Sequence, residues 1–292
     1  MNTFINNNKS SKKKVVFVMG ATGTGKSRLS IDLAIHFQGE IINSDKMQVY
    51  KGLDIITNKI TDIEKQGVPH HLLGKIEPDA DFTADDFCIQ AIIFIEKILK
   101  SGNIPIIVGG SNSYVEKLVE DPVFMFKYNY DCCFIWIDVA ALPVLNSFVC
   151  QRVDQMVHAG LVDEVRKIFV SDADYTRGIR RSIGVSEMDK YLREENKLDN
   201  NEVSKKKLLE SAIEEIKLNT CILICHQLEK IRRLKNEKMW PLNYIDATNV
   251  FRKIGKEGAD NAWKEIVSKP SLKIVEEFLK YEGDNINHVE AA

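Results

Sequence analysis

The stretch that decides the fold is VVFVMGATGTGKSRLSIDL, residues 15–33. Its first five residues are apolar and mostly β-branched, as in a buried strand, and helical periodicity follows from Lys26 to Phe37. Between them, residues 20–27 match the pattern G-x-x-x-x-G-K-[S/T] of a phosphate-binding loop, in the strand-loop-helix context that this loop requires. The sequence therefore predicts a P-loop NTPase-like α/β fold that holds a polyphosphate where its first strand ends.

The motif predicts which residues would contact the phosphates. Glycines let backbone N–H groups converge on phosphate oxygens, and the N-terminus of the following helix favours negative charge. Lys26 supplies a full positive charge, and the Ser27 hydroxyl is suited to ligate Mg²⁺. The pattern does not say which polyphosphate is bound. The predicted binding residues are Gly20, Ala21, Thr22, Gly23, Thr24, Gly25, Lys26 and Ser27.

Short apolar runs then alternate with helical patterns, which is typical of a parallel sheet flanked by helices. Strands are predicted at 40–44, 104–110, 132–139 and 244–248, and helices at 83–100, 143–170, 179–193, 203–235 and 260–281. Thr83 is a plausible N-cap for the first of these helices. We therefore predict a flexible leader (1–14), a P-loop α/β core (15–142), a helical subdomain (143–235), and a C-terminal return to the core with a tail (236–292).

The composition restricts the classes of function. Forty basic and forty-two acidic residues give a formal charge of −2, which argues against a protein that coats duplex nucleic acid. The six cysteines are irregularly spaced; Cys221, Cys225 and His226 lack the further ligand that a zinc site needs, so we expect reduced, buried thiols. No apolar run approaches the ~20 residues of a membrane span. The leader lacks acidic residues but has no arginine, so we expect a cytoplasmic protein, with the plastid as the alternative.

Other phosphate-loop proteins remain as alternatives. TNKITD (57–62) has the wrong spacing for the base-specificity motif of a GTPase. FIWID (134–138) could be a metal-binding strand with Asp138 near Mg²⁺, but Val139 follows where many ATPases place a glutamate. The segment TRGIRR (176–181) could form an arginine lid over phosphates. A small-molecule kinase and a nucleotide-binding scaffold without turnover are therefore open.

Asp45 follows the second predicted strand, at the edge where open α/β sheets place ligands. From this point the chain resembles the isopentenyltransferase family, most closely its plant adenylate branch, and the resemblance runs from about Val15 to Ala247. Long motifs in the same order carry it: INSDKMQVYKGLDIITNK (42–59), GVPHHLLG (67–74), GGSNSY (109–114), YDCCFIWIDV (130–139), RVDQMVHAGLVDEV (152–165), GIRRSIGVSE (178–187) and IKLNTCILICHQLEKIRRL (216–234).

The resemblance implies an enzyme that transfers a dimethylallyl group from dimethylallyl diphosphate to N6 of the adenine of ATP or ADP, the first step of cytokinin biosynthesis. Lys26 and the rest of the loop would hold the donor diphosphate with Mg²⁺ as cofactor, and Asp45 matches the family's general base. Arg152 matches a basic position that would clamp the diphosphate; an exposed salt bridge is its alternative role. ATP or ADP and the donor are the expected partners, without nucleic acid or membrane, and we expect a monomer.

The nearest rival is the tRNA-modifying branch of the same family. That branch typically has GGTGLY where this chain has GGSNSY, and carries a larger helical insertion after it, so a free nucleotide is the favoured acceptor. In ICHQLEK (224–230) the family usually has arginine where this chain has His226, which loses charge at neutral pH. One or two of Arg177, Arg180 and Arg181 are expected to meet acceptor phosphates. The pair His70 and His71 is interpreted as part of a structural loop.

Overall fold

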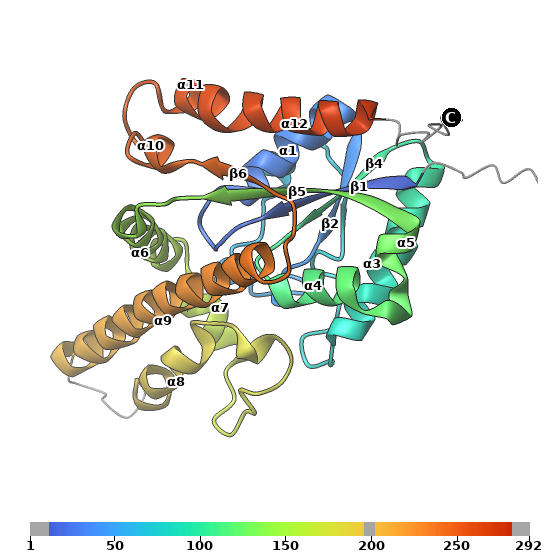
Figure 1. Cartoon of the computed structure of the whole chain (residues 1–292). Coiled ribbons are helices and arrows are strands. Elements are labelled where there is room, and N and C mark those ends of the chain that lie inside the picture. Colours follow the sequence, from blue (N-terminus) through green and yellow to red (C-terminus); the bar gives the residue numbers. More distant parts are fainter. Residues whose placement is uncertain (1–11, 196–201, 282–292) are drawn as a thin grey trace, which may run out of the picture.

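The computed structural model describes residues 12–195 and 202–281 (Figure 1). Within them, six strands form one parallel sheet in the order β3-β2-β4-β1-β5-β6. The predicted parallel α/β fold is therefore confirmed. The strands are β1 (Lys13–Met19), β2 (Gly39–Asn43), β3 (His70–His71), β4 (Ile104–Val108), β5 (Tyr130–Asp138) and β6 (Leu242–Asp246).

Strand β1 lies at the centre of the sheet, which explains its unbroken apolar run. It pairs with β4 and β5, and Phe17 stands opposite Ile107 on one side and Phe134 on the other. The rings of Phe17 and Phe134 stack with centroids 4.8 Å apart. Because helices cover both faces of a parallel sheet, no residue in the middle of such a strand has a solvent side to which a polar group could turn.

Helices α1 and α12 cover one face of the sheet, and α3, α4 and the C-terminal half of α9 lie on the other (Figure 1). Helix α3 begins with the predicted cap, since the Asp86 amide donates to the Thr83 hydroxyl at 3.2 Å and the Asp86 carboxylate accepts from the Thr83 amide at 2.8 Å. The longer helices are α1 (Lys26–Phe37), α3 (Ala84–Lys100), α4 (Asn112–Glu120), α6 (Leu142–His158), α7 (Leu161–Ile168), α8 (Val185–Glu194), α9 (Glu202–Asn236) and α12 (Lys269–Lys280).

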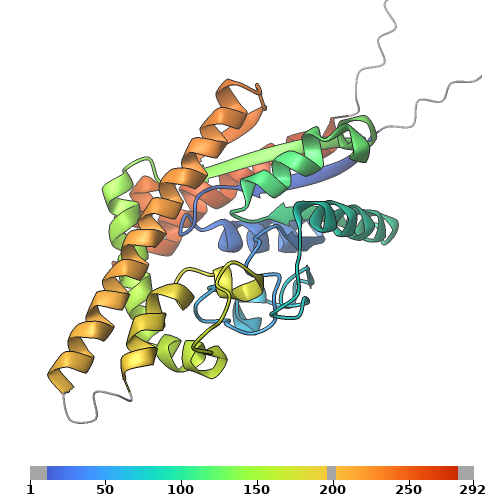
Figure 2. The same cartoon turned by 90° about the horizontal axis from the view of Figure 1, so that it is seen from below.

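Shorter helical turns complete the connections. They are α2 (Asp62–Lys65), η1 (Pro122–Phe124), α5 (Phe126–Asn129), η2 (Gly178–Arg181), α10 (Thr248–Phe251), α11 (Ala259–Trp263) and η3 (Lys264–Ser268). Helices α7 and α8 and the N-terminal half of α9 project away from the sheet, as Figure 2 shows. They are close in space to α6, which contacts both α7 and α9. These elements fall within the predicted helical subdomain, whose boundaries at 143 and 235 stay a prediction.

Two predicted helices are wrong in their extent, each because of a glycine. The helix expected over 143–170 breaks at Gly160, whose φ of 106° ends α6 and starts α7. The helix expected over 179–193 begins only at Val185, after Gly184 with a φ of 102°. A Cβ atom at Gly184 would lie 2.3 Å from Cδ1 of Ile56, so this close approach requires glycine.

The ends of the chain and the histidine pair also differ from expectation. Strand β1 already begins at Lys13, inside the predicted leader, and residues 1–11 and 282–292 lie outside the described part. The last helix passes through a π-helical turn at Lys264–Ser268, and β6 starts two residues before the predicted strand. His71 pairs with Glu40 at 2.7 Å and stacks on Phe94, and with His70 it forms the edge strand β3 instead of a loop.

Candidate active site

A cavity of about 430 Å³ opens at the carboxyl edge of the sheet, where the segments after β1, β2 and β4 meet. Helix α6 closes one side, and residues 250–263 close another. Both polar and apolar side chains face this space. Its lining includes Thr22, Gly23, Gly25, Lys26, Ser27, Asn43, Asp45, Gln48, Asn58, Glu64, Gly109, Gly110, Phe148, Arg152, Gln155, Phe251 and Trp263.

The phosphate-binding loop forms the floor of the cavity. Gly25 caps α1 in the left-handed conformation, and a Cβ atom there would lie 2.7 Å from the Trp263 ring, so only glycine fits. The helix N-terminus thus points its unpaired N–H groups at the cavity, which suits an anion. Of the predicted residues, Gly20, Ala21 and Thr24 do not line the cavity; the Thr24 hydroxyl instead donates to the Ala21 carbonyl at 3.0 Å and braces the loop.

Lys26 folds back over the loop, where its Nζ donates to the Ala21 carbonyl at 2.7 Å. Burial lowers the pKa of Lys26 from 10.5 to about 8; the charge of Asp45 raises it, and the charge of Arg152 lowers it further. A half-buried ammonium with so few acceptors is unfavourable without a counter-ion. The position therefore favours a ligand that brings negative charge.

Arg152, on α6, reaches the same loop. Its Nη2 donates to the Thr22 hydroxyl at 3.1 Å, while its Nε is buried with no hydrogen-bond partner among the described residues. Burial lowers the pKa of this guanidinium to about 10. None of the ion pairs within residues 12–195 and 202–281 includes Arg152, so the alternative of an exposed salt bridge is wrong for this geometry. Arg152 and Lys26 together make the loop end of the cavity cationic.

Asp45 stands at the other side of the cavity floor, just after β2. Its Oδ1 accepts from the amides of Met47 at 2.9 Å and Gln48 at 3.3 Å. Its backbone is held by Asn43, whose Oδ1 accepts from the Asp45 amide at 3.1 Å. Oδ2 receives no hydrogen bond from the described residues. It faces Gly110, since a Cβ atom built on Gly110 would lie 3.6 Å from this oxygen. One oxygen is thus fixed and the other is available to accept a proton.

Gln227, on α9, was missed by the sequence analysis. Its Oε1 accepts from the Thr22 amide at 2.7 Å, and its Nε2 donates to the Gly110 carbonyl at 3.0 Å. The side chain therefore joins the phosphate-binding loop to the Gly109–Gly110 turn opposite Asp45. A sequence signal existed, because Gln227 is a polar residue between Ile224 and Leu228, which lie on the buried face of the helix.

Replacing Gln227 with leucine tests this bridge. The variant leaves the Thr22 amide without its acceptor and leaves the Gly110 carbonyl with the Asn112 amide alone, so we expect a loss of about 1–3 kcal/mol in the free energy of unfolding in urea. His226→Ala is the matched control, because His226 directly precedes Gln227 on α9 and its side chain is exposed. If both variants unfolded at the wild-type urea concentration, the bridge would be ruled out as a stabilising contact.

Several candidates lie away from the cavity. Arg177 and Arg180 pair with Asp81 and Asp79, and Arg181 donates to the Tyr50 hydroxyl at 3.2 Å. His226 does not line the cavity. The expectation that Asp138 lies near bound metal finds no support, because Asp138 does not line the cavity and accepts from the Tyr244 hydroxyl at 3.3 Å.

The cysteines form no metal site in the described residues. No group of three or more His, Cys, Asp or Glu side chains that could hold a metal occurs there. All six thiols are free in the described residues. The expectation that they are buried is correct for Cys88 and Cys133 and wrong for Cys225, which is exposed on α9. Among the described helices, none combines the length and hydropathy of a membrane span.

Known proteins show which family the chain belongs to. Residues 48–129 and 125–234 match the family described as IPP transferase. The chain is 56% identical over 283 residues to Adenylate isopentenyltransferase 5, chloroplastic, of Arabidopsis thaliana, which covers 96% of this chain and 84% of that protein. It is 51% identical over 286 residues to Adenylate isopentenyltransferase 7, mitochondrial, of the same plant, covering 96% and 86%.

The chain therefore belongs to the IPP transferase family. This extent of identity places it among the plant adenylate isopentenyltransferases, enzymes of cytokinin biosynthesis. The resemblance seen in the sequence, and the enzyme class that it implied, are confirmed.

Solved structures agree with the fold. A eukaryotic dimethylallyltransferase acting on tRNA superposes with a TM-score of 0.77 at 24% identity, covering 94% of this chain and 81% of that one. The full-length tRNA isopentenylpyrophosphate transferase of Bacillus halodurans gives 0.68 at 27% identity, covering 92% and 99%. The P-loop architecture is thus shared with enzymes of the tRNA branch.

Proposed function

We propose that the chain transfers the dimethylallyl group of dimethylallyl diphosphate to N6 of the adenine of ATP or ADP, inside the cavity described above. One observation carries the proposal: the unpaired Oδ2 of Asp45 and the cations Lys26 and Arg152 line the same cavity. A base and a diphosphate site placed together are what this reaction needs. The names of the similar Arabidopsis enzymes, which describe adenylate isopentenyltransferases, support the same acceptor.

In the proposed reaction the bond between C1 of the allyl group and the diphosphate oxygen breaks, and the diphosphate leaves with the electron pair. A bond forms between C1 and the exocyclic N6, which loses a proton to Oδ2 of Asp45. The N6 lone pair is delocalised into the ring, so removing the proton as the bond forms strengthens the nucleophile. Lys26, Arg152 and the N–H groups of the loop stabilise the charge on the leaving oxygens.

The described residues of this site offer few ligands for Mg²⁺. Ser27 is a hydroxyl ligand at the start of α1 and lines the cavity. No described acidic cluster is present to build a protein cage. Mg²⁺ is commonly bound by few protein ligands together with substrate phosphates and water, which agrees with this donor set. We propose that Ser27 holds Mg²⁺ beside the donor diphosphate, where the ion would add positive charge against the leaving group.

We further propose three exposed cations outside the cavity lining, Lys46, Arg181 and Lys230, as candidates to meet the acceptor phosphates; Lys46 is the residue after Asp45. Burial lowers the pKa of Lys46. The charge of Arg181 lowers it further, the charge of Asp45 raises it, and the charge of Lys230 lowers it by a smaller amount. None of these three cations forms an ion pair within the described ranges. Uncompensated cations at one edge favour a di- or triphosphate over a monophosphate, which supports ATP or ADP. Of the arginines predicted to meet acceptor phosphates, Arg181 fits this role, while Arg177 and Arg180 are paired with carboxylates.

The acceptor is tested by analysing products with mass spectrometry. Purified protein with Mg²⁺ and dimethylallyl diphosphate is offered ATP, ADP, AMP or unmodified tRNA in separate reactions. Prenylated ATP or ADP is the expected product. Prenylated tRNA alone would assign the chain's activity to the alternative branch, and phosphorylation of a small molecule without prenyl transfer would favour a kinase.

The pKa of Lys26 predicts how donor use depends on pH. Because this pKa lies at about 8 in the free protein, Lys26 loses its charge as the pH rises through that value. We expect kcat/KM for the donor to fall above pH 8, whereas kcat falls only at higher pH, since bound diphosphate raises the pKa of Lys26. Rate measurements across this range test the prediction.

Lys26→Arg provides the control for the pH profile. Its guanidinium stays charged over the whole range, so the fall above pH 8 should disappear even if the rate is lower. A wild-type kcat/KM that stays constant well above pH 8 would contradict the prediction.

The location in the cell is a separate proposal. Two similar enzymes carry names that end in chloroplastic and one carries a name that ends in mitochondrial, which supports an organelle over the expected cytoplasm, and the two chloroplastic names support the plastid alternative. We propose a plastid location, to be tested by imaging the full chain fused at its C-terminus to a fluorescent protein in plant cells. A diffuse cytoplasmic signal would favour the original expectation.

A further inference from the structure

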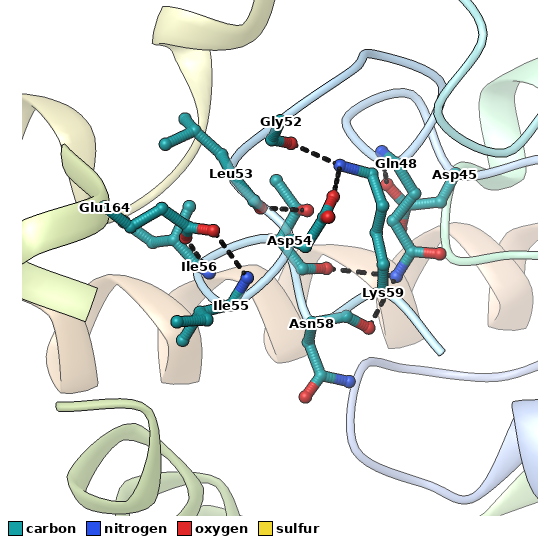
Figure 3. Close-up of polar contacts among 11 residues, drawn as sticks. Asp45, Gln48, Gly52, Leu53, Asp54, Ile55, Ile56, Asn58, Lys59 and Glu164 are labelled. Carbon is teal, nitrogen blue, oxygen red and sulfur yellow. Dashed lines mark hydrogen bonds and ion pairs between the residues drawn. The ribbon is translucent and has the colours of Figure 1, made fainter. Parts of the chain in front are cut away.

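A short turn at residues 53–58 lies between Glu164 of α7 on one side and Gln48 and Asp45 on the other (Figure 3). Within it the Thr57 amide donates to the Leu53 carbonyl at 3.0 Å and the Asn58 amide to the Ile55 carbonyl at 3.0 Å. A single turn of this kind is marginal by itself, because fixing its dihedral angles costs more than so few hydrogen bonds return. It therefore depends on contacts from outside.

Glu164, on α7, supplies the principal outside contact. Its Oε1 accepts from the Ile55 amide at 3.0 Å, and its Oε2 accepts from the Ile56 amide at 2.9 Å. These amides lie at the start of the turn, where N–H groups have no acceptor within it. A carboxylate that takes both of them acts as a charged cap, and hydrogen bonds to a charged group are stronger than neutral ones. Figure 3 shows both oxygens directed at the turn.

The same region is also held by apolar contacts. A Cβ atom at Gly184 would lie 2.3 Å from Cδ1 of Ile56, and one at Gly160 would lie 3.9 Å from Cδ1 of Ile55. The side chains of Ile55 and Ile56 therefore reach the two glycines that break the helical stretch. The apolar side chains of Ile55 and Ile56 therefore hold the turn against the helical part in addition to the Glu164 carboxylate.

The opposite side of the turn meets the cavity. The Gln48 side chain donates through Nε2 to the Thr57 carbonyl at 3.0 Å and to the Asn58 carbonyl at 3.2 Å. Gln48 and Asn58 both line the cavity. The backbone amide of Gln48 donates to Oδ1 of Asp45 at 3.3 Å, so a continuous set of contacts runs from Glu164 to the proposed base.

We propose that Glu164 is a positioning residue for the acceptor. By capping the 53–58 turn it fixes Asn58 and Gln48 at the side of the cavity next to Asp45, and it thereby orients the Asp45 carboxylate toward the adenine. The proposed donor site is the loop after β1 with Arg152, and among the described residues no hydrogen bond or ion pair joins Lys26 or Arg152 to the 53–58 turn. The inference rests on the proposed function, because it assigns this side of the cavity to the acceptor nucleotide.

The test compares Glu164→Gln with Asp163→Asn. Asp163 is the adjacent acid on α7, with a side chain 74% exposed and paired with Arg166, so its variant changes charge without touching the turn. For Glu164→Gln we expect the KM for ATP or ADP to rise about tenfold, as for a lost charged hydrogen bond at a positioned group, with the donor KM nearly unchanged. Glu164→Asp, which keeps the charge but not the reach, should lie in between.

Amide hydrogen exchange provides a second measurement that does not depend on activity. In Glu164→Gln the amides of residues 53–58 should exchange faster, and so should those of 45–48, while both segments stay as in wild type in Asp163→Asn. If Glu164→Gln raised the KM for the nucleotide and the KM for the donor by the same factor, the positioning role would be overturned. The same holds if the amides of 53–58 exchanged faster while those of 45–48 exchanged as in wild type. A wild-type protein without prenyl transfer would instead overturn the proposed function, and the exchange result would still decide whether Glu164 controls the turn.

Discussion

The Asp45→Asn protein is expected to transfer the dimethylallyl group about 10³-fold more slowly than wild type, because it loses the base that takes the proton from N6. The substitution preserves the local structure. The asparagine Oδ1 can still accept from the amides of Met47 and Gln48, and only the unpaired Oδ2 is replaced by an NH₂ group. Steady-state rates with saturating nucleotide and donor measure the effect. They are taken below pH 7, because the loss of the Asp45 charge lowers the pKa of Lys26 further and would weaken donor binding at higher pH.

Glu64→Gln is the matched control for this variant. Glu64 also lines the cavity, but it belongs to the capping box of α2, where the amide and the hydroxyl of Thr61 both donate to its Oε2, each at 2.8 Å. Glutamine can make the same capping contacts. We expect this variant to keep the wild-type rate. Equal losses in Asp45→Asn and Glu64→Gln would show that the general charge of the cavity, and not a base at residue 45, governs the reaction.

Replacing Lys26 with methionine is expected to reduce kcat/KM for the donor about 10³-fold, since each positioned charge on a leaving group contributes several kcal/mol to the transition state. The same change should raise the melting temperature of the free protein. Burial lowers the pKa of Lys26, so its charged form is unfavourable in the folded state at neutral pH, and a neutral side chain removes that cost. Activity and stability thus change in opposite directions.

This opposition separates a binding role from a structural one. A lysine that mainly held the loop through its contact with the Ala21 carbonyl would lower both activity and melting temperature when replaced. The experiment is a thermal melt of both proteins beside the kinetic assay. A methionine variant with wild-type kcat/KM would contradict the assignment of Lys26 to the donor diphosphate.

The parallel α/β class, most of the strands and the phosphate-binding loop could be predicted because they depend on local pattern, whereas the order of the strands in the sheet was not predicted. The buried run before Gly20, the loop glycines and the helix after Lys26 lie within 20 residues of each other, and each is recognisable by itself. Asp45 could be placed at the same edge, because parallel strands bring their carboxyl ends together.

Other features depend on contacts between distant residues. Gln227 lies 205 positions from Thr22, and Glu164 lies 109 positions from Ile55. A local sequence pattern therefore cannot predict either contact. The breaks at Gly160 and Gly184 were missed since a glycine within a helical pattern is tolerated often enough to be ambiguous. At Gly184 the φ of 102° favours glycine, and the approach of Ile56, which is 128 positions away in the chain, leaves little room for a Cβ atom.

The measurement that tests the central claim most directly is the position of the prenyl group on the product. Wild type and Asp45→Asn are incubated with dimethylallyl diphosphate, Mg²⁺ and ADP, and the product nucleotide is fragmented by tandem mass spectrometry. We predict that wild type yields ADP carrying the dimethylallyl group on N6 and that the variant yields almost none in the same time. A group attached to a phosphate or to a ring nitrogen, or equal yields of the N6 product from both proteins, would contradict the account.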